Sequence, residues 1–99
     1  NRQRKWYIPY LDFQKALIHF NLNEYSLAEK YVDSAINNYA GELDMILGNC
    51  YLLKGKILDK NKMNIEAEEY YYKCIELDNF SHAMKESKIL IDYNQRKRN

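Results

Sequence analysis

Apolar side chains recur every three or four positions along most of the chain, with polar side chains between them. In the first such stretch they fall at Tyr10, Phe13, Leu17 and Phe20, which is the spacing of one helix face. No segment alternates apolar and polar residues with the period of two that a strand needs. The pattern predicts five helices, at about residues 9–22, 24–38, 42–60, 64–77 and 80–93. We therefore expect an all-α protein.

Polar residues, asparagines and single glycine and proline residues separate the predicted helices. Pro9 suits a first helical turn, because its missing N–H would have no helical partner there. Residues 21–23 (Asn-Leu-Asn) should close the first helix, since asparagine tolerates the left-handed conformation of a C-terminal cap. Gly41, residues 59–62 and residues 78–79 mark the later breaks. These breaks support the five-helix prediction.

Part of the chain repeats at an offset of 39 residues. The small residues Ala16, Ala28 and Ala35 return as Gly55, Ala67 and Cys74, with spacings of 12 and 7 residues in both copies. The same offset joins Lys15 to Lys54, Ile18 to Ile57, Glu29 to Glu68, Tyr31 to Tyr70 and Ile36 to Ile75. Helix pairs repeated near this period are typical of stacked arrays, in which small side chains let neighbouring helices cross closely.

On these residues the chain resembles the tetratricopeptide-repeat family. That family reads small residue, turn, aromatic residue and two further small residues, which are here Ala16, Asn23, Tyr25, Ala28 and Ala35. The resemblance implies a right-handed stack of antiparallel helix pairs, with two divergent repeats at 9–40 and 41–79 and a capping helix at 80–93. The second copy departs further from the pattern, because Asn64 stands in the aromatic position. A helical bundle without repeat geometry is the alternative.

We interpret residues 1–99 as a single helical domain and, because the chain begins at Asn1, as a fragment of a longer protein. The basic residues of 94–99 are expected to form a frayed tail. Divergent, proline-poor repeats rich in Tyr and Asn are also similar to the sensor domains of Rap/PlcR-type peptide-sensing bacterial regulators. This second resemblance implies a cytoplasmic regulator.

In tetratricopeptide arrays the first helix of each pair lines a groove that receives a peptide. The resemblance places Phe13, Leu17, Phe20, Asn21, Asn49, Leu52, Lys56, Asp59 and Lys60 in that groove, with Tyr10 beside them. Aromatic side chains supply contact area, and Asn or Lys can bond a peptide backbone or carboxylate. The alternative is that the aromatic face of the first helix is core. A clamp for a terminal carboxylate is disfavoured, since Leu17 and Lys56 stand where such repeats need asparagine.

The charge balance and hydropathy of the chain argue against nucleic-acid and membrane binding. Fifteen basic and 14 acidic residues give a net charge of +1, which provides no overall attraction to nucleic acid or to an anionic membrane. Arg2, Arg4 and Lys5, with the basic residues at 96–98, are expected to be solvated ends. No apolar run is long enough for a membrane span, and no signal peptide is visible.

Catalysis, cofactors and metals find little support in the sequence. His19 and His82 fall on different predicted helices, and Cys50 and Cys74 have no zinc-site spacing. The two cysteines suggest no disulfide framework, which favours a reducing, cytoplasmic setting. We expect a non-enzymatic module that binds a protein or short peptide. The alternative is a segment that associates with another copy of itself, because two repeats fall short of the roughly three that bury a continuous core.

Overall fold

The computed structural model describes residues 7–39, 44–77 and 81–98, and within these ranges the chain forms helices and no strand. The helices are α1 (Tyr7–Asn21), α2 (Tyr25–Asn37), α3 (Asp44–Lys60), α4 (Asn64–Glu76) and α5 (His82–Arg98). The all-α prediction is confirmed, and the bounds of α1 to α4 agree with the predicted ones to within one helical turn. The predicted breaks at Gly41 and 78–79 and the basic residues at 2–5 lie outside the described residues.

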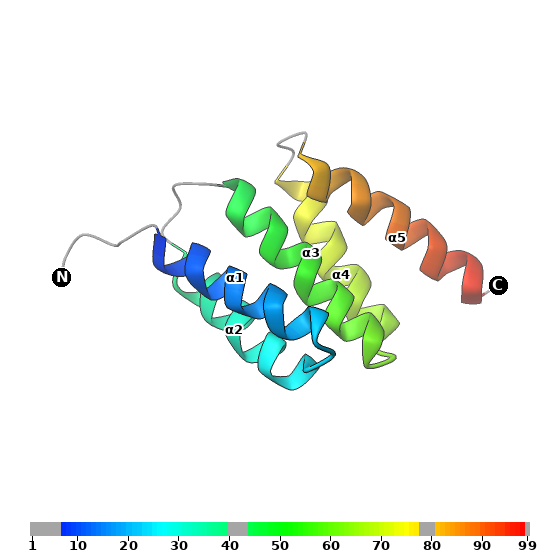
Figure 1. Ribbon diagram of the computed structural model, residues 1–99. Coiled ribbons are helices and arrows are strands. Elements are labelled where there is room, and N and C mark those ends of the chain that lie inside the picture. The colour runs from blue at the N-terminus through cyan, green and yellow to red at the C-terminus, as the bar shows by residue number, and fades with distance from the viewer. Residues whose placement is uncertain (1–6, 40–43, 78–80, 99) are drawn as a thin grey trace.

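The helices form a stack of antiparallel pairs. Short turns at 22–24 and 61–63 join α1 to α2 and α3 to α4. Each helix packs on its neighbour in the chain, and α3 also contacts α1 and α5. Figure 1 shows the helices lying side by side, with α1 and α2 at one end of the stack and α5 at the other. None of the helices in the described ranges has the length and hydropathy that crossing a membrane requires.

The two intra-pair turns repeat the same backbone hydrogen bonds at the offset of 39 residues. Asn23 and Lys62 both have a φ of 63°, in the left-handed region. The N–H of Glu24 donates to the carbonyl of His19 at 2.8 Å, and that of Met63 donates to Leu58 at 2.9 Å. Together with the 3.0 Å bonds Asn23–Phe20 and Lys62–Asp59, each set forms a Schellman cap. The sequence repeat is therefore also a structural repeat, and residues 21–23 close α1 as expected.

The repeated small residues lie where the helices cross. Ala16, Ala28, Ala35, Gly55, Ala67 and Cys74 are all buried. Gly55 makes the closest approach, because a Cβ atom there would lie 2.7 Å from Cδ1 of the Tyr71 ring. The equivalent positions of the first repeat hold Ala16 and Val32, whose side chain is smaller than that of Tyr71, and both are fully buried in one core cluster. The second repeat thus combines a smaller residue on α3 with a larger one on α4.

The helix α5 is longer than the sequence pattern predicts. It continues to Arg98, so residues 94–98 are helical and the expectation of a frayed tail from residue 94 is corrected. Asn94 is buried and bonds Asp59 of α3, while Arg98 pairs with Glu68 of α4. These partners lie on other helices, and contacts with them hold the last turns of α5 in place.

Candidate partner-binding groove

A cavity of about 390 Å³ lies where the C-terminal ends of α1, α3 and α5 meet α4. Its lining residues are Phe20 from α1, Lys56, Asp59 and Lys60 from α3, Asn64 and Tyr71 from α4, and Leu90, Tyr93, Asn94 and Lys97 from α5. The volume falls in the range of sites that take small molecules or single side chains of a partner. Four helices therefore converge on one candidate binding site.

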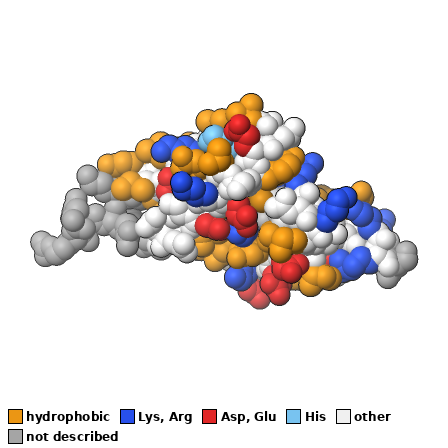
Figure 2. All heavy atoms as spheres, turned by 90° about the horizontal axis from the view of Figure 1, so that it is seen from below, with side chains coloured by type: hydrophobic (Ala, Val, Ile, Leu, Met, Phe, Trp, Pro, Cys, Tyr) orange, Lys and Arg blue, Asp and Glu red, His pale blue; other side chains and the backbone are white. Residues whose placement is uncertain are grey.

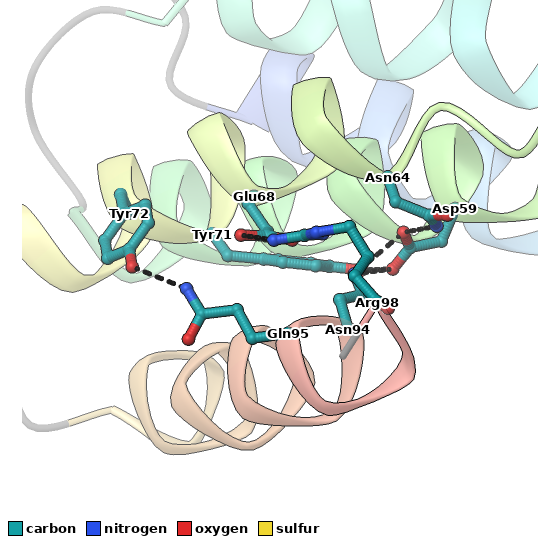
Figure 3. A network of polar contacts seen from close by, with 8 residues as sticks. All are labelled: Asp59, Asn64, Glu68, Tyr71, Tyr72, Asn94, Gln95 and Arg98. Carbon is teal, nitrogen blue, oxygen red and sulfur yellow. Dashed lines mark hydrogen bonds and ion pairs between the residues drawn. The ribbon is translucent and has the colours of Figure 1, made fainter.

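A hydrogen-bonded network centred on Asp59 forms one wall of the cavity (Figure 3). The hydroxyl of Tyr71 donates to Asp59 Oδ2 at 2.6 Å, and the amide of Asn64 donates to Oδ1 at 2.7 Å. The amide of Asn94 reaches the same carboxylate from α5, at 3.0 and 3.1 Å. Asp59 thereby joins α3, α4 and α5, and its oxygens hold the cavity in shape.

The Tyr71 side chain is part of this wall and of the core at once. Its ring is fully buried and packs against Gly55. Burial raises the pKa of the phenol, and the hydrogen bond to Asp59 raises it further. Tyr71 therefore stays protonated and keeps donating to Asp59 at neutral pH.

Lysine side chains surround the cavity. Lys56 is paired with Glu86 of α5 at 2.6 Å, which ties α3 to α5 at the rim. Lys60 is exposed, and Lys97 lies over the Tyr93 ring with its Nζ 5.5 Å from the ring centre. Figure 2 shows Lys and Arg side chains gathered toward the end of the molecule where α5 terminates. The lining therefore carries three lysines, one of them paired with Glu86, and one carboxylate.

The apolar part of the lining comes from α1 and α5. Phe20 is half-buried and lies against Tyr25 with ring centres 5.5 Å apart. Leu90 is also half-buried, and Tyr93 has 58% of its surface exposed. Phe20, Leu90 and Tyr93 therefore form the apolar part of the lining.

The structure divides the predicted groove residues into two groups. Phe20, Lys56, Asp59 and Lys60 line the cavity together. Phe13 and Leu17 pack against the first core cluster, and Leu52 is buried in the second one beside Ala83 and Ile91 of α5. Asn49 is half-buried and Asn21 and Tyr10 are exposed, and none of these three lines the cavity. Leu52 is thus corrected from a groove position to a core position, because α5 covers it.

Sequence reasoning missed the contributions of α4 and α5 to the cavity. Leu90, Tyr93, Asn94 and Lys97 recur at helical spacing on one face of α5. That period continues past residue 93, where the helix was expected to end, and it was the available signal. Tyr71 carried no such signal, since its role depends on Gly55 and Asp59 of another helix.

The cysteine and histidine side chains, which could in principle take part in catalysis, are either buried in the core or lie toward the surface. Burial raises the pKa of the Cys50 thiol to about 12, and burial also raises that of Cys74, so both thiols are protonated and poor nucleophiles. His19 Nδ1 lies 2.7 Å from Glu24 Oε1, while His82 is almost fully exposed near Glu86. In the ranges that the structure describes, no three His, Cys, Asp or Glu side chains are grouped to hold a metal ion.

Comparison with known proteins identifies one family. Residues 48–80 match the family model described as tetratricopeptide repeat. The matched span contains most of α3 and all of α4, and it falls in the second repeat, the copy that departs further from the family pattern. No curated protein and no solved structure matches the chain. Repeats of this family are generally modules for interaction between proteins.

Proposed function

Because the chain contains a tetratricopeptide repeat, we propose that it is a non-enzymatic module that binds a protein or short peptide at the cavity between α1, α3 and α5. The observation that supports this function best is the lining of the cavity. Phe20, Lys56 and Lys60, placed in a groove by family resemblance, come together there with the α5 residues Leu90 and Lys97. The site is therefore built from helices far apart in the sequence.

The lining also suggests the chemistry of the partner. Phe20, Leu90 and Tyr93 offer contact to one apolar side chain, and Lys60 and Lys97 stand beside them. Asp59 is already bonded to three donors, so it contributes shape and not a free acceptor. We infer a partner segment in which an apolar residue is flanked by Asp or Glu.

The resemblance to Rap/PlcR-type domains suggests a narrower function for the same cavity. In a peptide-responsive bacterial regulator the cavity would receive a signalling peptide in the cytoplasm. Binding would tighten the contacts of α5 with α3 that Lys56–Glu86 and Asn94–Asp59 already make. A change in hydrogen exchange along α5 on adding the peptide would support this role, and unchanged exchange would remove it.

Selection from a displayed library of random peptides against the native chain tests the proposed function. Selected peptides should share an apolar residue flanked by acidic ones. Lys60→Glu should weaken their binding about tenfold, which corresponds to about 1.4 kcal/mol, as measured by fluorescence anisotropy with a labelled selected peptide. Lys60 is exposed, so this change leaves the fold intact.

Two further variants make the result specific to the cavity. Phe20→Ala removes an apolar contact and should weaken binding in the same assay. Lys88→Glu makes the same charge change as Lys60→Glu at an exposed position of α5 outside the cavity lining, and it should leave binding unchanged. Equal effects of Lys60→Glu and Lys88→Glu, or no effect of either cavity variant, would show that the cavity is not the binding site.

A further inference from the structure

The helix α1 and the turn after it present a stripe of exposed apolar residues. Ile8, Leu11, Ile18 and Leu22 are 41%, 49%, 58% and 62% exposed, and Lys15, also exposed, lies among them. At 3.6 residues per turn Ile8, Leu11, Lys15 and Ile18 share one side of α1, and Leu22 follows in the turn after the helix. Phe20 lies on the opposite side of α1. The stripe is therefore distinct from the cavity. We call these five residues the α1 stripe.

The repeat shows what covers such a stripe elsewhere in the molecule. At the offset of 39 residues, Leu11, Lys15 and Ile18 correspond to Cys50, Lys54 and Ile57 of α3, which are 1%, 7% and 0% exposed. Cys50 and Ile57 belong to one core cluster with Val32 of α2. The helix α2 thus buries on α3 the residues whose equivalents on α1 are exposed.

The helix that covers α3 has a specific charge pattern. Lys54 Nζ lies 2.8 Å from Glu29 Oε2 and 2.8 Å from Asp33 Oδ1, and these two carboxylates are four residues apart on α2. Burial alone would lower the pKa of Lys54, but the hydrogen bonds to Asp33 and Glu29 raise it above its ordinary value. Lys54 is therefore charged in the interface, and a covering helix without carboxylates would leave that charge uncompensated.

From this correspondence we propose that the α1 stripe docks an amphipathic helix of a partner protein that carries two carboxylates four residues apart. The two carboxylates form ion pairs with Lys15, as Glu29 and Asp33 do with Lys54. An apolar residue between them packs on Ile18, as Val32 packs in the core cluster that contains Ile57. On α1, Lys15 lies over the Tyr31 ring with Nζ 5.6 Å from its centre, as Lys54 lies over the equivalent Tyr70 ring at 5.7 Å. The exposed lysine is thus already held beside the surface that the partner would cover.

A stapled helical peptide with the sequence of residues 24–38 is the probe, since this is the helix that covers the equivalent face of α3. It should bind the full chain in isothermal titration calorimetry. Lys15→Glu should weaken binding at least tenfold, and Ile18→Ser should also weaken it. Lys88→Glu, a matched charge change on α5, should leave binding unchanged. Circular dichroism of each variant checks that the fold is kept.

A charge exchange makes the test specific to the predicted contact. A peptide with Glu29→Lys and Asp33→Lys should bind the Lys15→Glu chain more tightly than it binds the native chain. If the original peptide binds the native, Lys15→Glu and Ile18→Ser chains equally, it has exchanged with α2 or bound elsewhere, and the proposal is overturned.

Sedimentation velocity of the chain alone tests whether a second copy of the chain covers the α1 stripe. The proposal expects a monomer in the absence of the peptide. A dimer that Ile18→Ser converts to a monomer would show that a second copy fills the stripe, which would overturn the acidic partner helix. The selected library peptides of the proposed function should bind Lys15→Glu and native chains alike, so failure at one surface is distinguishable from failure at the other.

Discussion

At the scale of residues, the two repeats solve the same packing problem with different side chains. The first repeat places Ala16 on α1 and Val32 on α2, and the second places Gly55 on α3 and Tyr71 on α4. The glycine leaves room for the ring, and the ring brings a hydroxyl to Asp59 at 2.6 Å. Because protein interiors are densely packed, a larger side chain at one position is tolerated when a smaller one stands at the neighbouring position. The exchange in the second repeat is what gives the cavity its hydrogen-bonded wall.

Gly55→Ala should destabilise the protein by about 1–3 kcal/mol, because the added Cβ meets the Tyr71 ring. The sign is informative, since Ala in place of Gly inside a helix otherwise stabilises by roughly 0.5–1 kcal/mol. Urea denaturation of single and double variants measures it. In a Tyr71→Val background, which restores the pair of the first repeat, the same Gly55→Ala change should be neutral or stabilising. Equal costs in both backgrounds would show that the two residues are not coupled.

The buried phenol of Tyr71 should make stability depend on pH in the alkaline range. The folded state holds the Tyr71 pKa above its ordinary value of 10.0, so above pH 10 the unfolded chain loses a proton that the folded chain keeps. The free energy of unfolding should then fall as pH rises. Chemical denaturation at a series of alkaline pH values should give a shallower fall for Tyr71→Phe than for the native chain. Tyr10→Phe, which deletes an exposed hydroxyl, serves as the control.

At the scale of elements, the helices whose bounds the sequence predicted well are those closed by local interactions. The cap at residues 21–23 and its copy at 60–62 are formed by hydrogen bonds between nearby backbone groups. Asparagine or a run of polar residues in the sequence predicts such caps. The end of α5 is different, because Asn94 and Arg98 bond Asp59 and Glu68 across the stack. A frayed basic tail and an ordered helix have the same local sequence, so only the tertiary contacts decide between them.

Asn94→Ala should loosen the last turns of α5. The change removes the amide that donates to both oxygens of Asp59, and a lost hydrogen bond to a charged group costs about 1.5–3 kcal/mol. Hydrogen exchange should become faster at the amides of residues 94–98. Gln95→Ala removes only the longer, exposed bond of 3.4 Å to the Tyr72 hydroxyl on the same turn and should change exchange less. Equal protection in the native chain and in Asn94→Ala would mean that the Asp59 contact does not hold the helix end.

In the candidate site, too, some residues could be predicted from the sequence, whereas the positions of others depend on tertiary contacts. Phe20, Lys56 and Lys60 were expected in a groove because of the family resemblance, and they line one cavity, since equivalent positions of successive first helices face the same way. Leu52 occupies a similar register position but is covered by α5, and no feature of its own helix indicates that cover. The α5 lining did have a signal in its helical spacing, but the expected end of the helix at residue 93 excluded Asn94 and Lys97 from it.

At the scale of the whole molecule, the stack is a series of junctions between helix pairs, and the α2–α3 junction holds a charged cluster. Lys54 is buried there between Glu29 and Asp33, which remain about one third or more exposed. Lys15 occupies the equivalent place on α1, over which none of the described helices packs as α2 packs on α3, and it is exposed. Comparing the two lysines therefore shows how much the helix junction, as distinct from the helix itself, contributes to the free energy of unfolding.

Lys54→Met and Lys15→Met provide the matched comparison. Methionine keeps most of the aliphatic stem and removes the charge, so helix propensity and apolar packing change little. Lys54→Met should lower the free energy of unfolding by about 1–3 kcal/mol, because it leaves Glu29 and Asp33 without their cation; their exposure to water keeps the loss below that of a fully buried pair. Lys15→Met should stay within about 0.5 kcal/mol of the native chain. Thermal and urea unfolding measure both, and equal losses would mean that Lys54 acts through its helix and not through the junction.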